Sequence, residues 1–438
     1  MLQSFSFLNG YVLYLAPLPV AWGVYALMRW RPDLASRSAL QAARETGRDI
    51  PPSLHPVIDP KRCIGCGACT HICPEGDLLG LIGGKAELIE PSSCIGHGAC
   101  KAACPVGAIE LVFGTSSRGF DIPVVSPQFE SSVPGLFIAG ELGGMGLIAN
   151  AIEQGRQAVG AIAKLDGLRK PDRLDLVIVG AGPAGLAASL EAKRLKLRSI
   201  TLEQDSLGGT VAHYPRGKII MTRPAHLPLY GRFRAKRIAK EALIAFWQKV
   251  VRRTKPAIRY GEHVDAVHPV AGGFEVLAGK THHLARAVLL ATGRRGTPRK
   301  LNVPGEDLPK VVYRLEEPQQ YRGQRVLVVG GGDSALEAAV RLAEEPGTRV
   351  TLSYRGDRLS RARRENREAV DAYARAGRLQ VSLASTVAAI EPKSVVVTLA
   401  GKHYRLANDA VIICAGGVLP AEFLAEAGIK VETKWGTQ

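Results

Sequence analysis

The fold of this 438-residue chain is indicated most directly by residues 174–204, which are LDLVIVGAGPAGLAASLEAKRLKLRSITLEQ. An apolar run, a glycine-rich turn, a helix-forming stretch and a second apolar run predict the order strand, turn, helix, strand. Gly180, Gly182 and Gly185 match the pattern G-x-G-x-x-G. The first glycine allows a sharp turn, the second lets backbone approach a pyrophosphate, and the third lets helix pack on strand. The phosphates are expected at the helix N-terminus.

A carboxylate at the end of the second predicted strand strengthens this assignment. Glu203 lies where an acidic residue accepts hydrogen bonds from ribose hydroxyls in dinucleotide-binding units. The combination is more specific than a glycine triplet alone, because it requires three features at fixed spacing. We therefore predict an α/β protein with a dinucleotide site here.

A second unit of the same kind begins at Arg325 with RVLVVGGGDSALEAAVRLAEE. Gly330, Gly332 and Ala335 occupy the fingerprint positions, and Ser334 lies at the expected helix start. The following strand continues as RVTLSYRGDRLSR, without a carboxylate where NAD would need one. Arg355 and Arg361 instead offer guanidinium groups for a 2'-phosphate, which favours NADPH over NADH. The alternative is that these arginines only belong to a solvated helix start.

Seven of the eight cysteines lie between Cys63 and Cys104, with the spacing of cluster ligands rather than of secreted disulfides. The first run is C-x2-C-x2-C-x3-C-P, and Gly65 and Gly67 suit a tight loop around a cluster. This run resembles bacterial two-cluster ferredoxins, in which the fourth cysteine of each run serves the other cluster. The resemblance implies one cluster held by Cys63, Cys66, Cys69 and Cys104. Zinc is the less specific alternative.

The second run repeats the spacing with a histidine in the second position. The resemblance assigns Cys94, Cys100 and Cys73 to the second cluster and leaves His97 as the departure from the pattern. Imidazole can replace thiolate as an iron ligand and raises the potential, as in Rieske centres. The other interpretation is a three-iron cluster with His97 merely nearby. The sequence leaves these two interpretations equal.

The two glycine-turn units together resemble flavoproteins of the thioredoxin-reductase-like class, over most of residues 115–438. Leu207, Gly208, Gly209 and Thr210 are similar to the glycine pair that approaches the flavin in that class. The stretch LLATG, which contains Thr292 and Gly293, is similar to the strand that links its two nucleotide domains. The resemblance implies FAD at the first unit and a nicotinamide nucleotide at the second.

The segment that normally ends such a flavoprotein comes early in this chain. Residues 133–141 are VPGLFIAGE, where Gly140 and Glu141 correspond to the glycine and acid that hold the FAD ribityl chain. Glutamate in place of aspartate is a departure from the family. We predict a circular permutation, which chains tolerate when their ends lie close together at the surface. A domain swap between two chains is the alternative.

Thioredoxin reductases carry a redox dithiol just before the NADPH turn, and this chain has no cysteine in residues 105–413. Flavin electrons therefore cannot leave by thiol–disulfide exchange, and the clusters are the remaining exit. NADPH delivers two electrons as hydride and a cluster takes one, so a flavin between them explains the three cofactors. Cys414 is alone in an apolar strand, where we expect a buried structural thiol.

The first 28 residues contain no charged side chain, and Phe5 to Met28 is long enough to cross about 30 Å of hydrocarbon. Arg29, Arg31 and Arg37 follow it, so the body is expected on the cytoplasmic face of the inner membrane, anchored by a single pass. A hairpin or interfacial anchor is the alternative. The formal charge of +17 favours anionic partners, but no nucleic-acid motif is present.

These observations predict an α/β chain with two Rossmann-like domains, a small α+β ferredoxin domain and an N-terminal membrane helix. The expected function is an NAD(P)H-dependent oxidoreductase moving electrons from NADPH through FAD and 4Fe-4S type clusters to a carrier protein or a quinone. Alternatives are an electron-transfer subunit of a glutamate-synthase-like complex and a redox sensor; a homodimer stays open. The expected segments are an anchor (1–30), a linker (31–56), the ferredoxin domain (57–113), the permuted segment (114–166), the FAD domain (172–304), the NAD(P)H domain (305–417) and a return to the FAD domain (418–438).

Overall fold

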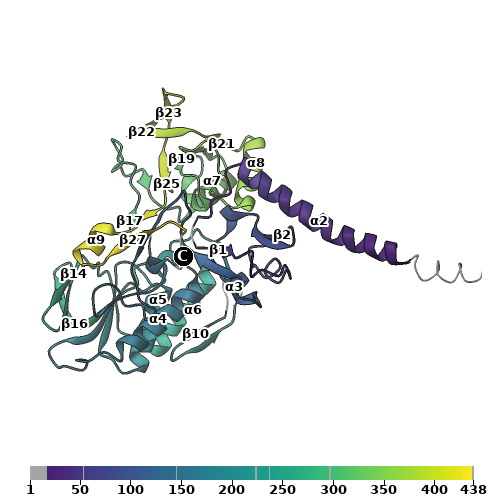
Figure 1. The fold of residues 1–438 in the computed structure, drawn as a ribbon. Coiled ribbons are helices and arrows are strands. Elements are labelled where there is room, and N and C mark those ends of the chain that lie inside the picture. The colour runs from purple at the N-terminus through teal and green to yellow at the C-terminus, as the bar shows by residue number, and fades with distance from the viewer. Residues whose placement is uncertain are drawn as a thin grey trace, which may run out of the picture. The chain divides into compact units, whose positions relative to one another are not determined.

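The computed structural model describes residues 17–52, 54–144, 146–221, 224–235, 237–294 and 297–436 (Figure 1). The chain divides into two compact units, Met1–Thr115 with Gly436–Gln438, and Ser116–Trp435. The mixed α/β class predicted from the glycine-turn motifs is confirmed, with separate sheets in the two units.

The first unit contains two small hairpin-like sheets around a cysteine-rich core. Strand β1 (His55–Ile58) pairs antiparallel with β4 (Ile109–Val112), and β2 (Leu79–Ile82) pairs antiparallel with β3 (Lys85–Leu88). The short helix α3 (Ala99–Ala103) and the 3-10 turn η1 (Pro91–Ser93) lie between them in sequence. Cys63, Cys69 and Cys100 are buried in the core of this unit.

The N-terminal helix α2 (Pro17–Glu45) corrects the membrane prediction. None of the described helices is long and apolar enough to cross a membrane. The predicted single-pass span and the inner-membrane location are therefore wrong. The beginning of the predicted span, residues 5–16, lies outside the described residues.

The second half of α2 belongs to the first unit rather than to a linker. Ser36 and Ala43 are buried, and a side chain at Gly80 of β2 would meet the Ser36 hydroxyl. Asp33 accepts a hydrogen bond of 2.6 Å from the Gly83 amide, and Arg48 forms an ion pair of 3.0 Å with Glu90. The stretch predicted as a linker, 31–56, thus begins as a packed helix.

The flavoprotein-like part of the second unit is a seven-stranded sheet in the order β13-β8-β7-β16-β15-β14, with β6 also paired to β16. Its strands are β6 (Leu136–Ile138), β7 (Leu174–Val179), β8 (Ser199–Glu203), β13 (Ile258–Tyr260), β14 (Ala266–Val270), β15 (Gly273–Ala278) and β16 (Thr281–Leu290). Strands β6, β7, β8 and β13 join the sheet in parallel pairs, whereas β14 and β15 pair antiparallel. The helices are α4 (Ile148–Ile162), α5 (Pro183–Arg194) and α6 (Lys240–Thr254). Near-continuous burial of β7 and of the second half of β16 is typical of strands covered on both faces.

The early segment of the chain completes this sheet within the same chain. Leu136, Phe137 and Ile138 of β6 pair with Val288, Leu289 and Leu290 of β16. Helix α4, which follows β6, packs on α5: a Cβ at Gly155 would lie 2.1 Å from the Ala184 carbonyl oxygen. The C-terminal strand β27 (Val431–Lys434) pairs antiparallel with β5 (Phe120–Pro123), just before the early segment. This arrangement has the connectivity that a circular permutation requires.

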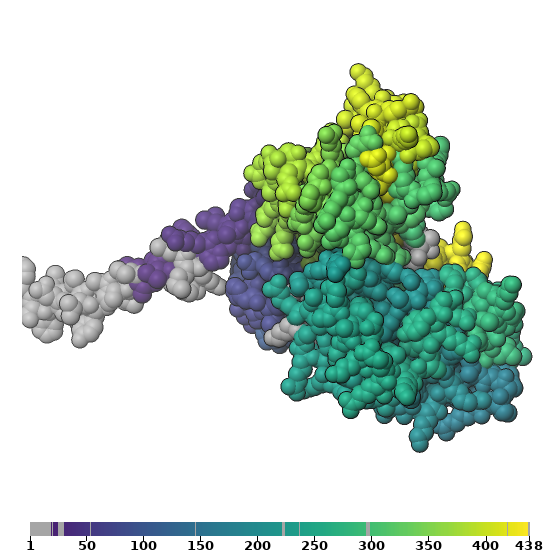
Figure 2. All heavy atoms as spheres, turned by 180° about the vertical axis from the view of Figure 1, so that it is seen from behind, coloured from purple at the N-terminus to yellow at the C-terminus, as the bar shows by residue number. Residues whose placement is uncertain are grey.

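The second nucleotide domain has five parallel strands in the order β18-β25-β19-β20-β21. They are β18 (Val311–Val312), β19 (Arg325–Val329), β20 (Arg349–Ser353), β21 (Leu379–Ser382) and β25 (Ala410–Ile413), with helices α7 (Asp333–Glu344) and α8 (Arg364–Arg375). An antiparallel sheet of β22 (Ser385–Glu391), β23 (Ser394–Leu399) and β24 (Lys402–Ala407) completes it. In space-filling view these residues, green to yellow, form a solid lobe (Figure 2).

Short elements join these sheets and complete their edges. They are η2 (Glu141–Gly143), η3 (Gly209–Val211), η4 (Pro318–Tyr321), α9 (Ala421–Glu426) and the pairs β9 (Ile219–Met221) with β12 (Arg237–Ala239), β10 (Ala225–Leu227) with β11 (Gly231–Phe233), and β17 (Thr297–Pro298) with β26 (Gly417–Val418).

Candidate functional site

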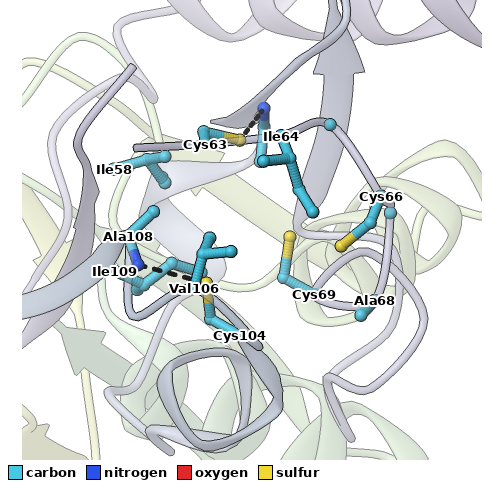
Figure 3. A pocket seen from close by; sticks show the side chains of 13 residues that line it. Ile58, Cys63, Ile64, Cys66, Ala68, Cys69, Cys104, Val106, Ala108 and Ile109 are labelled. Atoms are coloured by element: carbon cyan, nitrogen blue, oxygen red, sulfur yellow. Dashed lines mark hydrogen bonds between the residues drawn. The ribbon is translucent and has the colours of Figure 1, made fainter. Parts of the chain in front are cut away.

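The cysteines of the first unit line two cavities. As in two-cluster ferredoxins, the fourth cysteine of each run lines the cavity of the other run. The first cavity is lined by Cys63, Cys66, Cys69 and Cys104. Their sulfur atoms lie around one space among the apolar side chains Ile58, Val106 and Ile109 (Figure 3). Cys104 comes from the far end of the second run, as the resemblance implied. Ligation itself remains a prediction.

The second cavity is lined by the remaining predicted ligands. Cys73 from the first run meets Cys94, His97 and Cys100 from the second, and Glu75 also lines this cavity. The His97 Nε2 atom lies 3.2 Å from the Glu75 Oε1 atom. The structure therefore brings all eight predicted metal-site residues into two groups of four.

Both cysteine runs have glycines with positive φ at matching positions, so the two loops can follow similar paths. Gly65 and Gly67 have φ of +68° and +75°, and Gly96 and Gly98 have φ of +72° and +73°. A Cβ at Gly65 would lie 2.0 Å from the Gly84 carbonyl oxygen, so only glycine fits. Cys66 lies between the two glycines of the first loop, and His97 lies between the two glycines of the second loop.

The sulfur atoms have a hydrogen-bonding and electrostatic environment typical of cluster ligands. The backbone amides of Ala86 and Ala108 lie 3.5 Å and 3.2 Å from the sulfur atoms of Cys63 and Cys104. Amide hydrogen bonds to sulfur are one way in which a protein adjusts a cluster potential. Burial raises the pKa of the Cys94 thiol to about 11, so cluster binding there has to release a proton. Among the described residues no group of three or more side chains is placed to hold a single metal ion.

The first glycine turn is built to receive a pyrophosphate. Gly180 has a φ of +100°, and a Cβ at Gly185 would lie 1.8 Å from the Gly180 carbonyl oxygen. Gly182 caps the N-terminus of α5, and no heavy atom lies within 4 Å of where its Cβ would be. The turn thus leaves open space in front of the helix N-terminus, where phosphate is favoured.

Glu203 is held at the end of β8 by two backbone amides. Its side chain accepts hydrogen bonds of 2.6 Å from Ala181 and 3.0 Å from Asp205, and the residue is 5% exposed. These bonds fix the carboxylate beside the turn, in the position that a ribose contact requires. The Leu207–Thr210 stretch lies against the same turn, because the Gly208 amide donates to the Ala181 carbonyl at 3.0 Å. A Cβ at Gly209 would lie 3.2 Å from Gly182 Cα.

Two further strand ends meet this turn, as parallel strands place their carboxyl ends at one edge. After β6, Gly140 adopts a φ of +85° and its amide donates to Gln154 Oε1 at 2.8 Å, with Glu141 next in the chain. After β16, the carbonyl of Ala291 would be 2.7 Å from a Cβ at Gly180. The Gly293 backbone in turn faces the Thr210 hydroxyl. The predicted FAD residues thus surround one edge of the sheet.

The second glycine turn has a backbone geometry similar to that of the first, but an aromatic side chain, Tyr354, lies against it. Gly330 has a φ of +147° and packs on the Cys414 carbonyl, and Gly332 caps α7 with open space beside it. Tyr354 follows β20, and a Cβ at Gly331 would lie 2.4 Å from its ring. Arg355 and Arg361 are exposed beyond it. No carboxylate stands directly after β20, as the sequence indicated.

Sequence reasoning missed two arginines near these sites. Arg118 is partly buried, and its pKa is lowered by burial and by the like charge of Arg361. Arg294 follows Thr292 and Gly293 and stacks on the Phe120 ring at 3.8 Å. No motif marks either residue, because only folding brings residues 118–121 beside the ends of distant strands.

Cys414 has the environment expected of a structural thiol. Burial raises its pKa to about 12, so the thiol stays protonated and is a poor nucleophile. The sequence contains no other cysteine outside the cluster runs.

The fold and these sites define an electron-transferring α/β oxidoreductase with two dinucleotide sites and a ferredoxin-type domain. A family model described as pyridine nucleotide-disulphide oxidoreductase matches residues 177–437, and a model described as 4Fe-4S dicluster domain matches residues 55–105. The chain belongs to the pyridine nucleotide-disulphide oxidoreductase family and carries a 4Fe-4S dicluster domain at its N-terminal end. The predicted fusion and the predicted NAD(P)H-dependent flavin enzyme are confirmed.

Relatives of known name support this assignment. A bacilliredoxin reductase from Bacillus subtilis is 26% identical over 266 residues, covering 59% of this chain and 82% of the relative. A ferredoxin–NADP reductase from Ignicoccus hospitalis is 29% identical over 269 residues, covering 59% of this chain and 83% of the relative. A solved bacillithiol disulfide reductase from Bacillus cereus is similar with a TM-score of 0.54 and 25% identity, covering 59% of this chain and 82% of that structure.

Proposed function

We propose that this enzyme takes electrons from NADPH and delivers them, through FAD and its own two clusters, to an electron-carrier protein. The observation that carries the proposal is the pair of cavities lined by Cys63, Cys66, Cys69 and Cys104 and by Cys73, Cys94, His97 and Cys100. The family matches support the more general assignment, which is an NAD(P)H-dependent flavin oxidoreductase with iron-sulfur cofactors.

The exit of electrons separates this chain from relatives named for disulfide substrates. Residues 105–413 contain no cysteine, and the protonated thiol of Cys414 is the sole cysteine outside the cluster runs. A flavin without a neighbouring dithiol cannot reduce a disulfide by thiol exchange. The relative from Ignicoccus hospitalis, named ferredoxin–NADP reductase, is therefore the better guide to the acceptor of this chain.

The chain's own residues bind and orient, and no side-chain acid or base is needed. Gly180, Gly182 and Glu203 would hold the adenosine and pyrophosphate half of FAD, and Gly140 and Glu141 would lie at its ribityl half. Bound FAD supplies the exchange between two-electron hydride transfer and single-electron delivery. The Leu207–Thr210 stretch closes over the Gly180 turn through the Gly208 amide. Arg355 and Arg361 supply the positive charge for a 2'-phosphate.

We propose in addition that His97 is the fourth ligand of the second cluster. His97 takes the place of Cys66 in a loop with matching backbone angles, and it lines the same cavity as the three thiols. Its Nε2 atom lies 3.2 Å from Oε1 of Glu75. A carboxylate on the second nitrogen fixes the ring and raises its basicity, as in other carboxylate–histidine–metal arrangements.

Iron content and spectroscopy test the histidine ligand. The wild-type chain should carry about eight irons, and His97→Ala should lose about one iron and show a three-iron signal in electron paramagnetic resonance. His97→Cys should retain about eight irons and shift the potential of one cluster only. Three-iron signals of equal size in wild type and His97→Ala would show that His97 does not bind iron.

The route through the clusters is tested by Cys66→Ala, with Cys414→Ala as the control outside the cluster runs. The Cys66 variant should bind FAD, and its flavin should still bleach with NADPH in stopped-flow absorbance, because the glycine turns lie in the other unit. Its steady-state reduction of an added ferredoxin should fall by at least tenfold. A normal rate of acceptor reduction would mean that electrons leave directly from the flavin.

A further inference from the structure

Arg294 lies at the edge of the sheet where the flavin site is built. It directly follows Thr292 and Gly293 at the carboxyl end of β16, beside the turns that follow β6 and β7. The carboxyl ends of parallel strands are where open α/β sheets bind ligands. The residue is therefore placed by the backbone at the ligand edge, although no family motif includes it.

The Arg294 guanidinium stacks on an aromatic ring and has a buried nitrogen without a hydrogen-bond partner among the described residues. It stacks on the Phe120 ring, with 3.8 Å between the guanidinium carbon and the ring centroid. Its Nη1 atom is buried and has no hydrogen-bond partner among the described residues. In the part of the chain that the structure describes, the other side-chain atoms in this condition are Ser92 Oγ and His283 Nε2, so Arg294 is the permanently charged residue of the three.

A buried, unpaired N–H on a charged group is costly, and arginine cannot relieve the cost by losing its proton. An unsatisfied buried donor destabilises the fold, and more so when the group is charged. Burial lowers the Arg294 pKa and the like charge of Arg118 adds to this, whereas Glu141 and Asp121 favour the charged form. The site thus keeps its charge while leaving the N–H groups of Nη1 for an acceptor from outside the chain.

We infer that Arg294 Nη1 contacts the bound FAD, on the half of the cofactor that Glu141 bounds. Phe120 stacks on the guanidinium, the charge of Glu141 favours its charged form, and an N–H of Nη1 meets an oxygen or nitrogen acceptor of the ribityl–flavin half. The adenosine and pyrophosphate half has its own partners at Gly182 and Glu203, so it does not need this donor. This inference rests on the proposed function only in taking FAD as the cofactor of the first turn.

The consequence is a bias toward the reduced cofactor. Reduction of a flavin adds negative charge to its ring system, and a fixed positive charge nearby stabilises that form in a low-dielectric site. Arg294 is therefore a positioning and potential-setting residue, and its loss should weaken binding of reduced FAD more than binding of oxidised FAD.

Arg294→Gln and Arg294→Lys separate the hydrogen bond from the charge. Arg294→Gln should raise the FAD dissociation constant about tenfold, measured by flavin fluorescence on titration of the flavin-free protein. It should also lower the two-electron midpoint potential by about 30 mV, which corresponds to a further tenfold preference lost for the reduced form. Arg294→Lys should lose FAD affinity but keep the potential, because the charge remains.

Arg232→Gln is the matched control, since Arg232 is an exposed arginine of the same domain. Its FAD affinity and potential should equal those of wild type. The potential is measured by reduction against a reference dye without any acceptor protein, so the result does not depend on the route through the clusters. If Arg294→Gln does not fold, a lowered potential in Arg294→Lys overturns the charge argument. Unchanged affinity and potential in Arg294→Gln would show that water satisfies Nη1 and would overturn the proposal.

Discussion

Gly155→Ala is the substitution whose effect the structure predicts most sharply. A Cβ at this position of α4 would lie 2.1 Å from the Ala184 carbonyl oxygen and 2.9 Å from its carbonyl carbon, both in the backbone of α5. Real Cβ atoms do not approach closer than about 3.0 Å, so the two helices would have to separate by about 0.9 Å. Backbone cannot rotate away as a flexible side chain can.

Two opposing effects determine the change in the free energy of unfolding: overpacking lowers it, and the higher helix propensity of alanine raises it. Overpacking of a well-packed interface costs about 1–3 kcal/mol and occasionally more. Replacing a helical glycine with alanine returns roughly 0.5–1 kcal/mol. We expect a net loss of about 1–2 kcal/mol in the free energy of unfolding, and weaker FAD binding because the N-terminus of α5 moves with the helix.

Gly160→Ala in the same helix is the matched control. No heavy atom lies within 4 Å of where its Cβ would be, so only the propensity gain remains. Urea unfolding followed by circular dichroism, with FAD titration on the same samples, measures both quantities. If Gly155→Ala is as stable as Gly160→Ala and binds FAD equally well, α4 does not pack on α5, and the early segment does not complete this domain as described.

Two further predictions concern the second nucleotide domain. Changing Arg355 and Arg361 together to alanine should raise the KM for NADPH at least tenfold with little change for NADH, since each charge-assisted contact contributes about 1.5–3 kcal/mol; equal use of both nucleotides by wild type would contradict this. Burial opposes the charged form of Glu306, but hydrogen bonds from the Leu301 amide, the Tyr313 hydroxyl and the Asn302 amide outweigh it and hold the pKa of Glu306 below its usual 4.5. This stability is present above about pH 4.5 and is lost as the pH falls through the folded-state pKa, so Glu306→Gln should cost about 1.5–3 kcal/mol at pH 7. The gap from wild type should shrink in acid, and a pH-independent gap in urea unfolding would contradict this.

The sequence alone determined the class of the protein and its cofactor chemistry. Both glycine turns, the acidic residue at Glu203 and the two cysteine runs are local patterns, because each needs only neighbouring residues at fixed spacing. The family matches confirm the fusion that these patterns predicted. The early position of VPGLFIAGE was also visible in the sequence, because a circular permutation changes where a motif lies in the chain but not its residues.

The membrane helix was predicted wrongly because hydropathy describes a stretch of chain and not its packing. The described helix α2 continues through Arg29, Pro32 and Arg37 and buries Ser36 and Ala43. None of the helices in the described ranges is therefore apolar over a length that would cross a membrane.

Only the tertiary structure decided which residues from separate segments share a site. It grouped Cys73 with Cys94, His97 and Cys100, and it placed Glu75 on the imidazole of His97. It also brought Phe120 to Arg294 across about 170 residues of chain and left Arg294 Nη1 without a partner. Such contacts depend on where strand ends meet in three dimensions, and no periodicity or spacing along one segment records that information.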